Sequence, residues 1–378
     1  MRVTRSLVVS SVCTLLLATA AAAQGALPPV VPSVPSSTAS PGGAWFERYQ
    51  DSRGGPESSD RWSRTFKVGP SGSLDISNIS GDIVITGGTG DEIRVEAVKR
   101  VHGRDTDEAK RQLAAVTIEA SERAGRVEIS TSYPHQQNNI SVDVDYTVQV
   151  PASTTVSVRS VSGDVRLTGV KGEARLETVS GNVTTANSGQ LAKVKSVSGD
   201  VSVTEGGSGD VLSLGSVSGN VLVKRLKART LEVQTVSGDV LLVDTACDRV
   251  LGKSVSGDMQ FGGPFAKAGR YEFSTHSGDV RVAVQGSMGF EITGTSFSGE
   301  LRSDLPLAGR QDNAGAEPAS DHRHGPRRQE LRGTFGDGSA LVVVQTFSGD
   351  VLVTSGAAEK GAGQKDKEKD KDKNRDRD

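Results

Sequence analysis

The chain has 378 residues, of which 24% are charged and only 4% aromatic, and its formal net charge is −2. A near-neutral chain has no electrostatic reason to bind nucleic acid or an anionic membrane, so we expect neither as a partner. No aromatic residue lies between Tyr146 and Phe261, and the interior there must therefore be built from Val, Leu and Ala.

Residues 1–23 resemble an export signal. Arg2 and Arg5 give a positive start, Leu7 to Leu17 form an apolar stretch, and small residues at 21–23 offer a cleavage site. The apolar stretch is short for a membrane span. We therefore expect an exported protein of the periplasm, cell surface or extracellular space, without a transmembrane segment in the mature chain.

Two cysteines are present, and Cys13 falls inside the predicted signal. Cys247 is then the single mature cysteine, so an internal disulfide is not expected. A small buried apolar role is predicted for Cys247, with a reactive or intermolecular thiol as the alternative.

Residues 24–60 are rich in Pro, Ser and Gly, a composition that favours a disordered linker. Trp45, Phe46 and Tyr49 interrupt it. These aromatic residues either lie back on the first folded strands or form a segment that docks on a partner.

Residues 61–151 alternate apolar and polar positions with period two, which predicts N-terminal strands. The exception is a stretch at about 105–116, where Leu113 and Val116 are three apart. Asp105 and Glu108 form a capping box there, so one short helix is predicted.

Residues 152–302 form a regular repeat. From Ser162 to Ser298 a series of Ser-Gly pairs recurs at steps of 18, 18, 20, 19, 19, 21 and 21 residues. Such a period indicates an all-β parallel β-solenoid, or β-helix, built from coils of 18–21 residues. Together with the equivalent pairs outside this range, the repeated Ser-Gly pairs begin at Ser80, Ser162, Ser180, Ser198, Ser218, Ser237, Ser256, Ser277, Ser298 and Ser348.

In most coils apolar residues occur one position before the serine and three and five positions after it, as in Val161, Val165 and Leu167. This alternation predicts a strand with all three side chains buried on one face. A second strand is expected about halfway round each coil, for example at 174–176.

Ser-Gly-Asp itself predicts a tight corner, because Gly tolerates positive φ and Ser and Asp bond nearby backbone amides. Asn182 and Asn220 replace the Asp in two coils, which favours a local Asx-type hydrogen bond. The alternative is a ladder of carboxylates that binds calcium. Residues 206–210 faintly resemble a calcium-binding repeat, in a single copy.

Residues 303–333 contain Pro306, Pro318 and Pro326 and break the period, so an inserted loop is predicted. Residues 334–354 restore the strands as a C-terminal coil. The remainder, 355–378, is rich in Lys and Asp and predicts a disordered charged tail.

No catalytic, cofactor-binding or metal-binding residue is predicted, and no cofactor is expected. Asp321-His322-Arg323-His324 is a weak metal candidate in the predicted loop, and His276 replaces the residue before one Ser-Gly pair. The remaining histidines and the basic residues on predicted exposed strands are scattered: His102, His135, Arg166, Arg175, Lys193, Lys195 and Arg281.

Val-Ser-Gly-Asp-Val recurring near 19 residues, with the opening stretch Ile79 to Ile83 and a strand ending at Val150-Pro151, resembles the bacterial β-strand-repeat family of proposed adhesins. The resemblance covers residues 65–354, apart from the insertion at 303–333. It implies an exported parallel β-solenoid and supplies no catalytic residues. The function of that family is itself largely unknown.

The expected function is a non-enzymatic envelope or surface scaffold, adhesin-like, whose partner is an envelope protein or a polysaccharide. The alternative is a carbohydrate-active β-helix that binds or cleaves polysaccharide. A calcium-stabilised adhesin is a third possibility.

Overall fold

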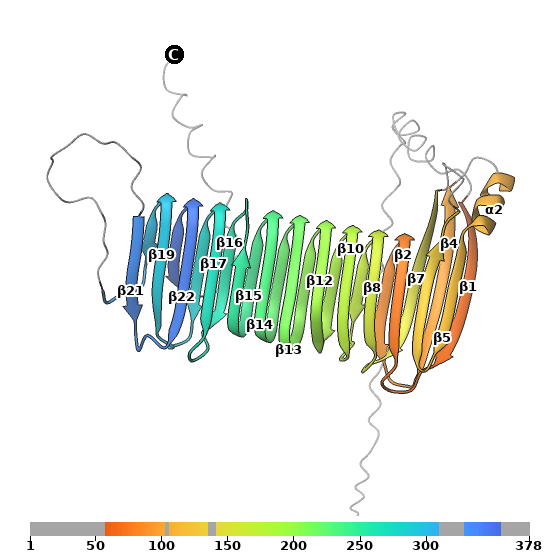
Figure 1. Cartoon of the computed structure of the whole chain (residues 1–378), viewed down its shortest axis with the longest axis horizontal. Helices are drawn as coiled ribbons and strands as arrows, with labels where there is room; N and C mark the ends of the chain where they lie inside the picture. Colours follow the sequence, from red (N-terminus) through yellow and green to blue (C-terminus); the bar gives the residue numbers. More distant parts are fainter. Residues whose placement is uncertain (1–56, 103–105, 135–140, 310–328, 357–378) are drawn as a thin grey trace, which may run out of the picture. The chain divides into compact units, whose positions relative to one another are not determined.

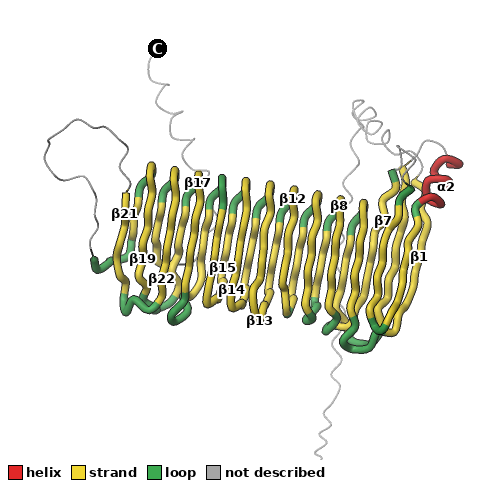
Figure 2. The backbone as a smooth tube through the Cα atoms, viewed as in Figure 1, coloured by secondary structure: helices red, strands yellow, loops and turns green. Residues whose placement is uncertain are grey.

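The computed structural model describes residues 57–102, 106–134, 141–309 and 329–356. The predicted all-β fold with one short helix is confirmed: 23 strands belong to one sheet, and the described helix is α2, Thr106–Ala115 (Figure 2). The predicted signal at 1–23, most of the linker and nearly all of the charged tail lie outside the described residues.

Each coil has two strands, one on each of two faces joined at the Ser-Gly-Asp corner. We call face A the side of the stack whose strands precede the corner along the chain, and face B the side whose strands follow it. Inward side chains of both faces form one continuous apolar core, mostly of Val, Leu and Ile. Burying these side chains is the main stabilising term of such a stack.

Face A consists of strands that lie side by side in an order different from that of the chain (Figure 1). They are, from one end to the other, β5 (Thr117–Arg123), β6 (Arg126–Ser132), β2 (Ser73–Ser80), β8 (Thr155–Ser162), β10 (Glu173–Ser180), β12 (Gln190–Ser198), the second halves of β13 (Val201–Ser218), β14 (Val221–Ser237) and β15 (Val240–Lys253), β17 (Arg270–Ser277), β22 (Ala340–Ser348), β19 (Phe290–Ser298) and β21 (Gln329–Phe335).

Face B has a matching order. Its strands are β1 (Glu57–Lys67), β4 (Glu92–His102), β7 (Val142–Pro151), β3 (Ile83–Gly88), β9 (Val165–Thr168), β11 (Val183–Ser188), the first halves of β13, β14 and β15, then β16 (Met259–Pro264), β18 (Val280–Gln285), β23 (Val351–Ser355) and β20 (Leu301–Ser303).

Successive coils pair in parallel, and their corner serines are partners in register, as Ser180 is of Ser198 and Ser198 of Ser218. The last coil departs from chain order. Strand β22 lies between β17 and β19, so the coil of Ser348 is inserted between those of Ser277 and Ser298. The sequence alone did not indicate this insertion, because the Ser348 coil has the same motif as its neighbours.

Antiparallel strands close the stack where parallel pairing stops. β5 pairs antiparallel with β6, β1 with β4 and β4 with β7, and β21 pairs antiparallel with β19 at the other end. Helix α2 packs against β1 and β4, burying Ala109 and Leu113. Such covers reduce the risk that an open strand edge pairs with another chain.

Two predicted boundaries differ from the structure. Strand β1 begins at Glu57, inside the predicted linker 24–60, because residues 57–67 pair along the length of β4. Strand β21 begins at Gln329, inside the predicted loop 303–333, and residues 310–328 of that loop lie outside the described part. Both strands are edge strands with charged residues, which a search for buried alternation overlooks.

The corner glycines allow close stacking of the coils. A Cβ atom on Gly181 would overlap the carbonyl oxygen of Gly163 in the coil before it, and Gly181 has φ of +144°. Glycines at the other corners meet their neighbours in the same way. Any side chain at this position would therefore force two coils apart.

We predict that Gly181→Ala lowers the free energy of unfolding by about 2–4 kcal/mol, through overlap and backbone strain. Gly209→Ala is the matched control, because a Cβ there meets nothing within 4 Å. Thermal and urea unfolding followed by circular dichroism would measure both. Equal stability of the two variants would contradict the stacking described here.

Candidate functional site

A column of side-chain hydrogen bonds runs through the Ser-Gly-Asp corners. The residue after each corner glycine except the last accepts, through Oδ1, the backbone N–H of the equivalent residue in the next coil, and Asp145 of β7 does the same at the start of the column without a preceding glycine. The acceptors are, in spatial order, Asp145, Asp82, Asp164, Asn182, Asp200, Asn220, Asp239, Asp258, Asp279 and Asp350, with N···O distances of 2.7 to 2.9 Å.

This column corrects the predicted local Asx hydrogen bond. Asp and Asn do share one role, but the bond joins successive coils rather than neighbouring residues: Asn182 Oδ1 accepts from Asp200, 18 residues later. Asn can replace Asp because both present the same Oδ1 acceptor. Exposed carboxylates that each accept an N–H need no metal to explain their alignment.

A second column, of small polar side chains, lies two residues before each corner serine and faces inward. Ser196 Oγ donates to the Gly181 carbonyl at 2.8 Å, and Ser216 Oγ donates to the Gly199 carbonyl at 2.9 Å. The buried members are Asn78, Ser160, Thr178, Ser196, Ser216, Thr235, Ser254, Thr275, Thr346 and Ser296. Several of them thus bind the carbonyls around which the chain turns, whereas the buried hydroxyl groups of Thr235, Ser254 and Thr275 have no hydrogen-bond partner among the residues that the structure describes.

The residue between this buried column and the corner serine therefore points outward. We call this row the outer ladder. Its apolar members are 36% to 50% exposed. In spatial order it comprises Ile79, Val161, Val179, Val197, Val217, Val236, Val255, His276, Phe347 and Phe297.

The prediction that Val161 and its equivalents are buried was wrong. Val165 and Leu167 are buried as predicted, but the chain turns between Val161 and Val165, and that turn places Val161 outside. The segment at 174–176, predicted as a separate second strand, belongs to β10, which continues to Ser180. The recurrent Ser or Thr two residues before each corner was the signal that could have revealed this.

One end of the outer ladder is aromatic. The rings of His276 and Phe347 stack with centroids 4.9 Å apart, and those of Phe347 and Phe297 stack at 4.8 Å. Their interplanar angles are 13° and 11°, so the three rings form one continuous stack across three coils. Because the rings face one another, their exposed edges give this end of the ladder larger apolar side chains than the Val part.

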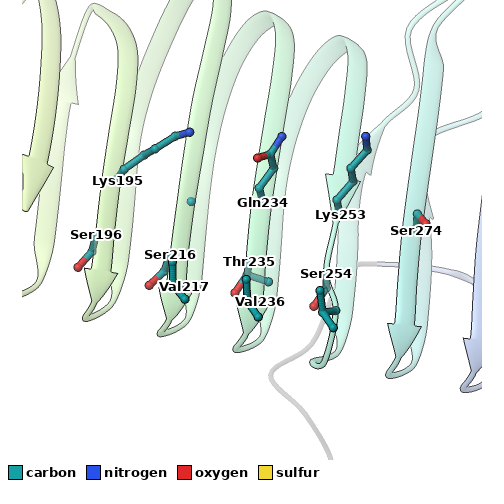
Figure 3. Close-up of a pocket in the computed structure, with 12 residues that line it drawn as sticks. Lys195, Ser196, Ser216, Val217, Gln234, Thr235, Val236, Lys253, Ser254 and Ser274 are labelled. Carbon is teal, nitrogen blue, oxygen red and sulfur yellow. The ribbon is translucent and has the colours of Figure 1, made fainter. Parts of the chain in front are cut away.

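A shallow groove of about 470 Å³ lies beside the Val part of the ladder (Figure 3). It crosses β12, β13, β14, β15 and β17, and two lysines, Lys195 and Lys253, stand along it. Its lining residues are Lys195, Ser196, Gly215, Ser216, Val217, Gln234, Thr235, Val236, Lys253, Ser254, Val255 and Ser274, none of them acidic. A hollow of about 350 Å³ adjoins Phe297 and Phe347.

The basic residues suggested by the sequence do not converge. Lys195 borders the groove, whereas Lys193 pairs with Glu177 at 2.9 Å and Arg175 pairs with Glu173. Arg166 and Arg281 lie on face B, on β9 and β18. These five residues therefore form no single basic site.

The histidine candidates are also separate. His276 is exposed and belongs to the outer ladder, and His102 is the last residue of β4. His135, Asp321, His322 and His324 lie outside the described residues. Within the described ranges, no group of three or more His, Cys, Asp or Glu is placed to hold a metal ion. Residues 206–210 lie in β13, where pairing with β14 shifts register after Ser208.

Cys247 is buried, with 3% of its surface exposed, as predicted. Burial raises the pKa of its thiol to about 12. Tyr271 lies nearby and donates to the Cys247 carbonyl at 2.7 Å, and burial likewise raises the Tyr271 pKa to about 12. Cys247 is thus a packing residue of the core.

Residues 72–354 match the model of the family described as Toastrack DUF4097. Among solved structures, a proposed adhesin from Bacteroides fragilis is 12% identical, with TM-score 0.39 and coverage of 78% of this chain and 97% of its own. No curated protein matches the chain.

Two further solved structures are similar over the same extent. A proposed cell adhesion protein from Clostridium sporogenes is 10% identical, with TM-score 0.23 and coverage of 79% and 100% of the two chains. A proposed lipid binding protein from Parabacteroides distasonis is 9% identical, with TM-score 0.36 and coverage of 79% and 97%.

The corner column predicts a difference between two substitutions of one residue. Asp200→Ala removes the acceptor for Asn220 N–H and should lower the free energy of unfolding by about 1 kcal/mol. Asp200→Asn keeps an Oδ1 acceptor and should be nearly neutral. Urea unfolding of both variants beside the parent measures this, and equal losses would argue against the inter-coil bond.

Burial predicts that Cys247 is unreactive in the folded protein. The thiolate is the reactive form, and a pKa of about 12 leaves the thiol protonated at pH 8. In a Cys13→Ala chain, a chromogenic disulfide reagent should react slowly before, and stoichiometrically after, addition of guanidinium chloride. Added Val211→Cys, at an exposed position, should react at once. Rapid native reaction of Cys247 would contradict its burial.

Proposed function

The chain belongs to the Toastrack DUF4097 family, and from this premise we propose that it is a non-enzymatic, exported β-solenoid of the cell envelope or surface. It acts as a scaffold or adhesin-like binding protein. The outer ladder and its groove are the surface on which it binds. The parallel pairing of successive coils supports the solenoid interpretation.

The continuity of the outer ladder is the observation that carries this proposal. Proteins rarely leave a long contiguous row of apolar side chains in water unless it contacts something. Here the same position is apolar and exposed in nine coils, although the chain could place a polar residue there at no cost to the core. Because the row follows the stack, its partner must also be extended.

The residues beside the ladder favour binding over catalysis. Hydrolysis of a glycan usually needs two carboxyl groups in one site, and the groove lining contains none. Its two lysines, Lys195 and Lys253, lie on β12 and β15, which are separated by β13 and β14. Two lysines separated in this way can attract an extended acidic surface. They are less suited to act together on one reacting atom of a substrate.

Export is proposed from the sequence of residues 1–23. In the described ranges, no helix is long and apolar enough to cross a membrane. The mature protein would then meet its partner in the periplasm or outside the cell.

Polysaccharide binding is the second candidate, and the aromatic end of the ladder favours it. Phe347 and Phe297 are exposed and line the hollow of about 350 Å³, where a sugar would contact the ring edges that the stack leaves open. A polysaccharide ligand would engage the hollow beside these rings rather than the Val groove.

The proposed binding surface can be tested with Val236→Asp in the outer ladder and Val211→Asp as the matched control. Both valines are exposed to a similar degree, and Val211 lies at the far end of its face A strand. We expect Val236→Asp to lower capture of an envelope component by at least tenfold, with unchanged circular dichroism. Val211→Asp should bind like the parent.

Incubating the parent protein and these variants with envelope polysaccharides distinguishes polysaccharide binding from binding through the Val groove. Phe347→Ala should abolish binding if the ligand is a glycan and leave it intact if the Val groove is the contact. Release of reducing ends by the parent protein would show catalysis and overturn the non-enzymatic proposal.

A further inference from the structure

The outer ladder is a straight row with one member per coil. Neighbouring parallel strands are about 4.8 Å apart, so its ten members extend over about 43 Å. A partner that repeats at the strand spacing can place one equivalent side chain against every member. A second copy of this chain has that repeat, which an ordinary globular surface lacks.

Two columns flank the ladder, and both contain charged residues. The first column consists of the residues three positions before each corner serine. The corner column, on the other side, consists of the corner Asp or Asn residues. The three basic residues of the first column occur in coils with a corner Asp: Arg159 with Asp164, Lys195 with Asp200, and Lys253 with Asp258.

The acidic member of that first column is Glu177, and its coil has Asn182 at the corner instead of Asp. No described coil therefore combines an acid in the first column with an acid at the corner. Lys195 and Lys253 have no ion-pair partner among the described residues, and most corner carboxylates are exposed. Lys195, Lys253 and most corner carboxylates are therefore available to a partner, whereas Glu177 is paired with Lys193.

We propose that a second copy of the chain docks on the outer ladder, with both stacks running in the same direction and a two-fold axis parallel to them. This names the partner for the binding surface and rests on the proposed function. In this arrangement each ladder residue faces its own counterpart. The first column of one copy lies over the corner column of the other, so Lys195 meets Asp200 of the second copy.

The opposite orientation is unfavourable. If the two stacks ran in opposite directions, corner carboxylates would face corner carboxylates along the length of the contact. Like charges juxtaposed at an interface select against that orientation. The parallel arrangement also brings the rings of His276, Phe347 and Phe297 against the same rings of the second copy.

The contact extends along the stack rather than across it. Its length of about 43 Å brings ten pairs of ladder residues together, one pair per coil. A two-fold contact of this kind is closed and leaves no matching surface free for further copies.

Single cysteines in the outer ladder test both contact and orientation. In the Cys13→Ala full chain, Val161→Cys, Val217→Cys and Val255→Cys should each form a covalent dimer under mild oxidation, because each faces its counterpart. Val211→Cys, which is exposed outside the ladder, should stay monomeric on a non-reducing gel. Cys247 is buried and should not contribute.

Cross-linking at one of the three positions alone would indicate opposite directions and overturn the proposed arrangement. Cross-linking at none of them, with a monomer mass for the parent protein by sedimentation at micromolar concentration, would overturn the dimer altogether. If the ladder variants of such a monomer still lose capture of an envelope component, the proposed function stands without the dimer.

A charge test uses a pair already present in the chain. Lys195→Glu should weaken the dimer at least tenfold, because it places Glu over Asp200 of the second copy. Adding Asp200→Asn recreates the Glu177 and Asn182 combination, keeps the Oδ1 acceptor, and should restore most of the affinity. Absence of any effect on the dissociation constant, or of recovery in the double variant, would contradict the proposed register.

Discussion

Close contact between the corner glycines of successive coils is the constraint on which the rest of the structure depends. The carbonyl of Gly163 occupies the space that a side chain on Gly181 would need, and the same arrangement recurs along the stack. Coils this close allow the corner Asp or Asn to accept an N–H from the next coil, and they allow hydroxyl groups to donate to the corner carbonyls. Because the residue two positions before the corner serine is held inside, the residue one position before that serine must lie outside. The exposure of the outer ladder is thus a geometric consequence of the corner. Its apolar composition is the reason to expect a binding partner.

The ends of the stack show how the repeat is stopped. Parallel coils expose unpaired backbone at both ends, and the chain covers these ends with antiparallel strands, β1 and β5 at one end and β21 at the other. Near the second end, the coil of Ser348 is placed between two coils that precede it in the chain. Except for β5, which pairs with the following strand β6, both devices use strands that are not adjacent along the chain to their partners. The outer ladder nevertheless stays in register through the inserted coil, because its Ser-Gly corner is the same.

Much of the fold could be predicted from the sequence, because a period of about 19 residues and the buried positions of Val165 and Leu167 follow from alternation alone. Burial of Cys247 and the position of the short helix followed from composition and spacing. The outward orientation of Val161 could not be predicted in this way. A corner between two strands changes which residues face inward, so the alternation of one strand does not continue into the next. The inter-coil role of Asp200 and Asn182 was also hidden, because a residue 18 positions away is not a neighbour in any local pattern. The order of the Ser298 and Ser348 coils could not be predicted either. It depends on which strands pair, and coils with the same motif give no indication of that.

Hydrogen exchange at the corner amides tests the central claim most directly. The N–H groups of Asp200, Asn220 and Asp239 belong to exposed residues, yet each donates to a side chain of the preceding coil. In isotopically labelled protein we predict strong protection of these amides, comparable to that of the central strands β13 and β14. Exchange of these three amides at the rate of unprotected exposed backbone would contradict the stacking of coils through their corners.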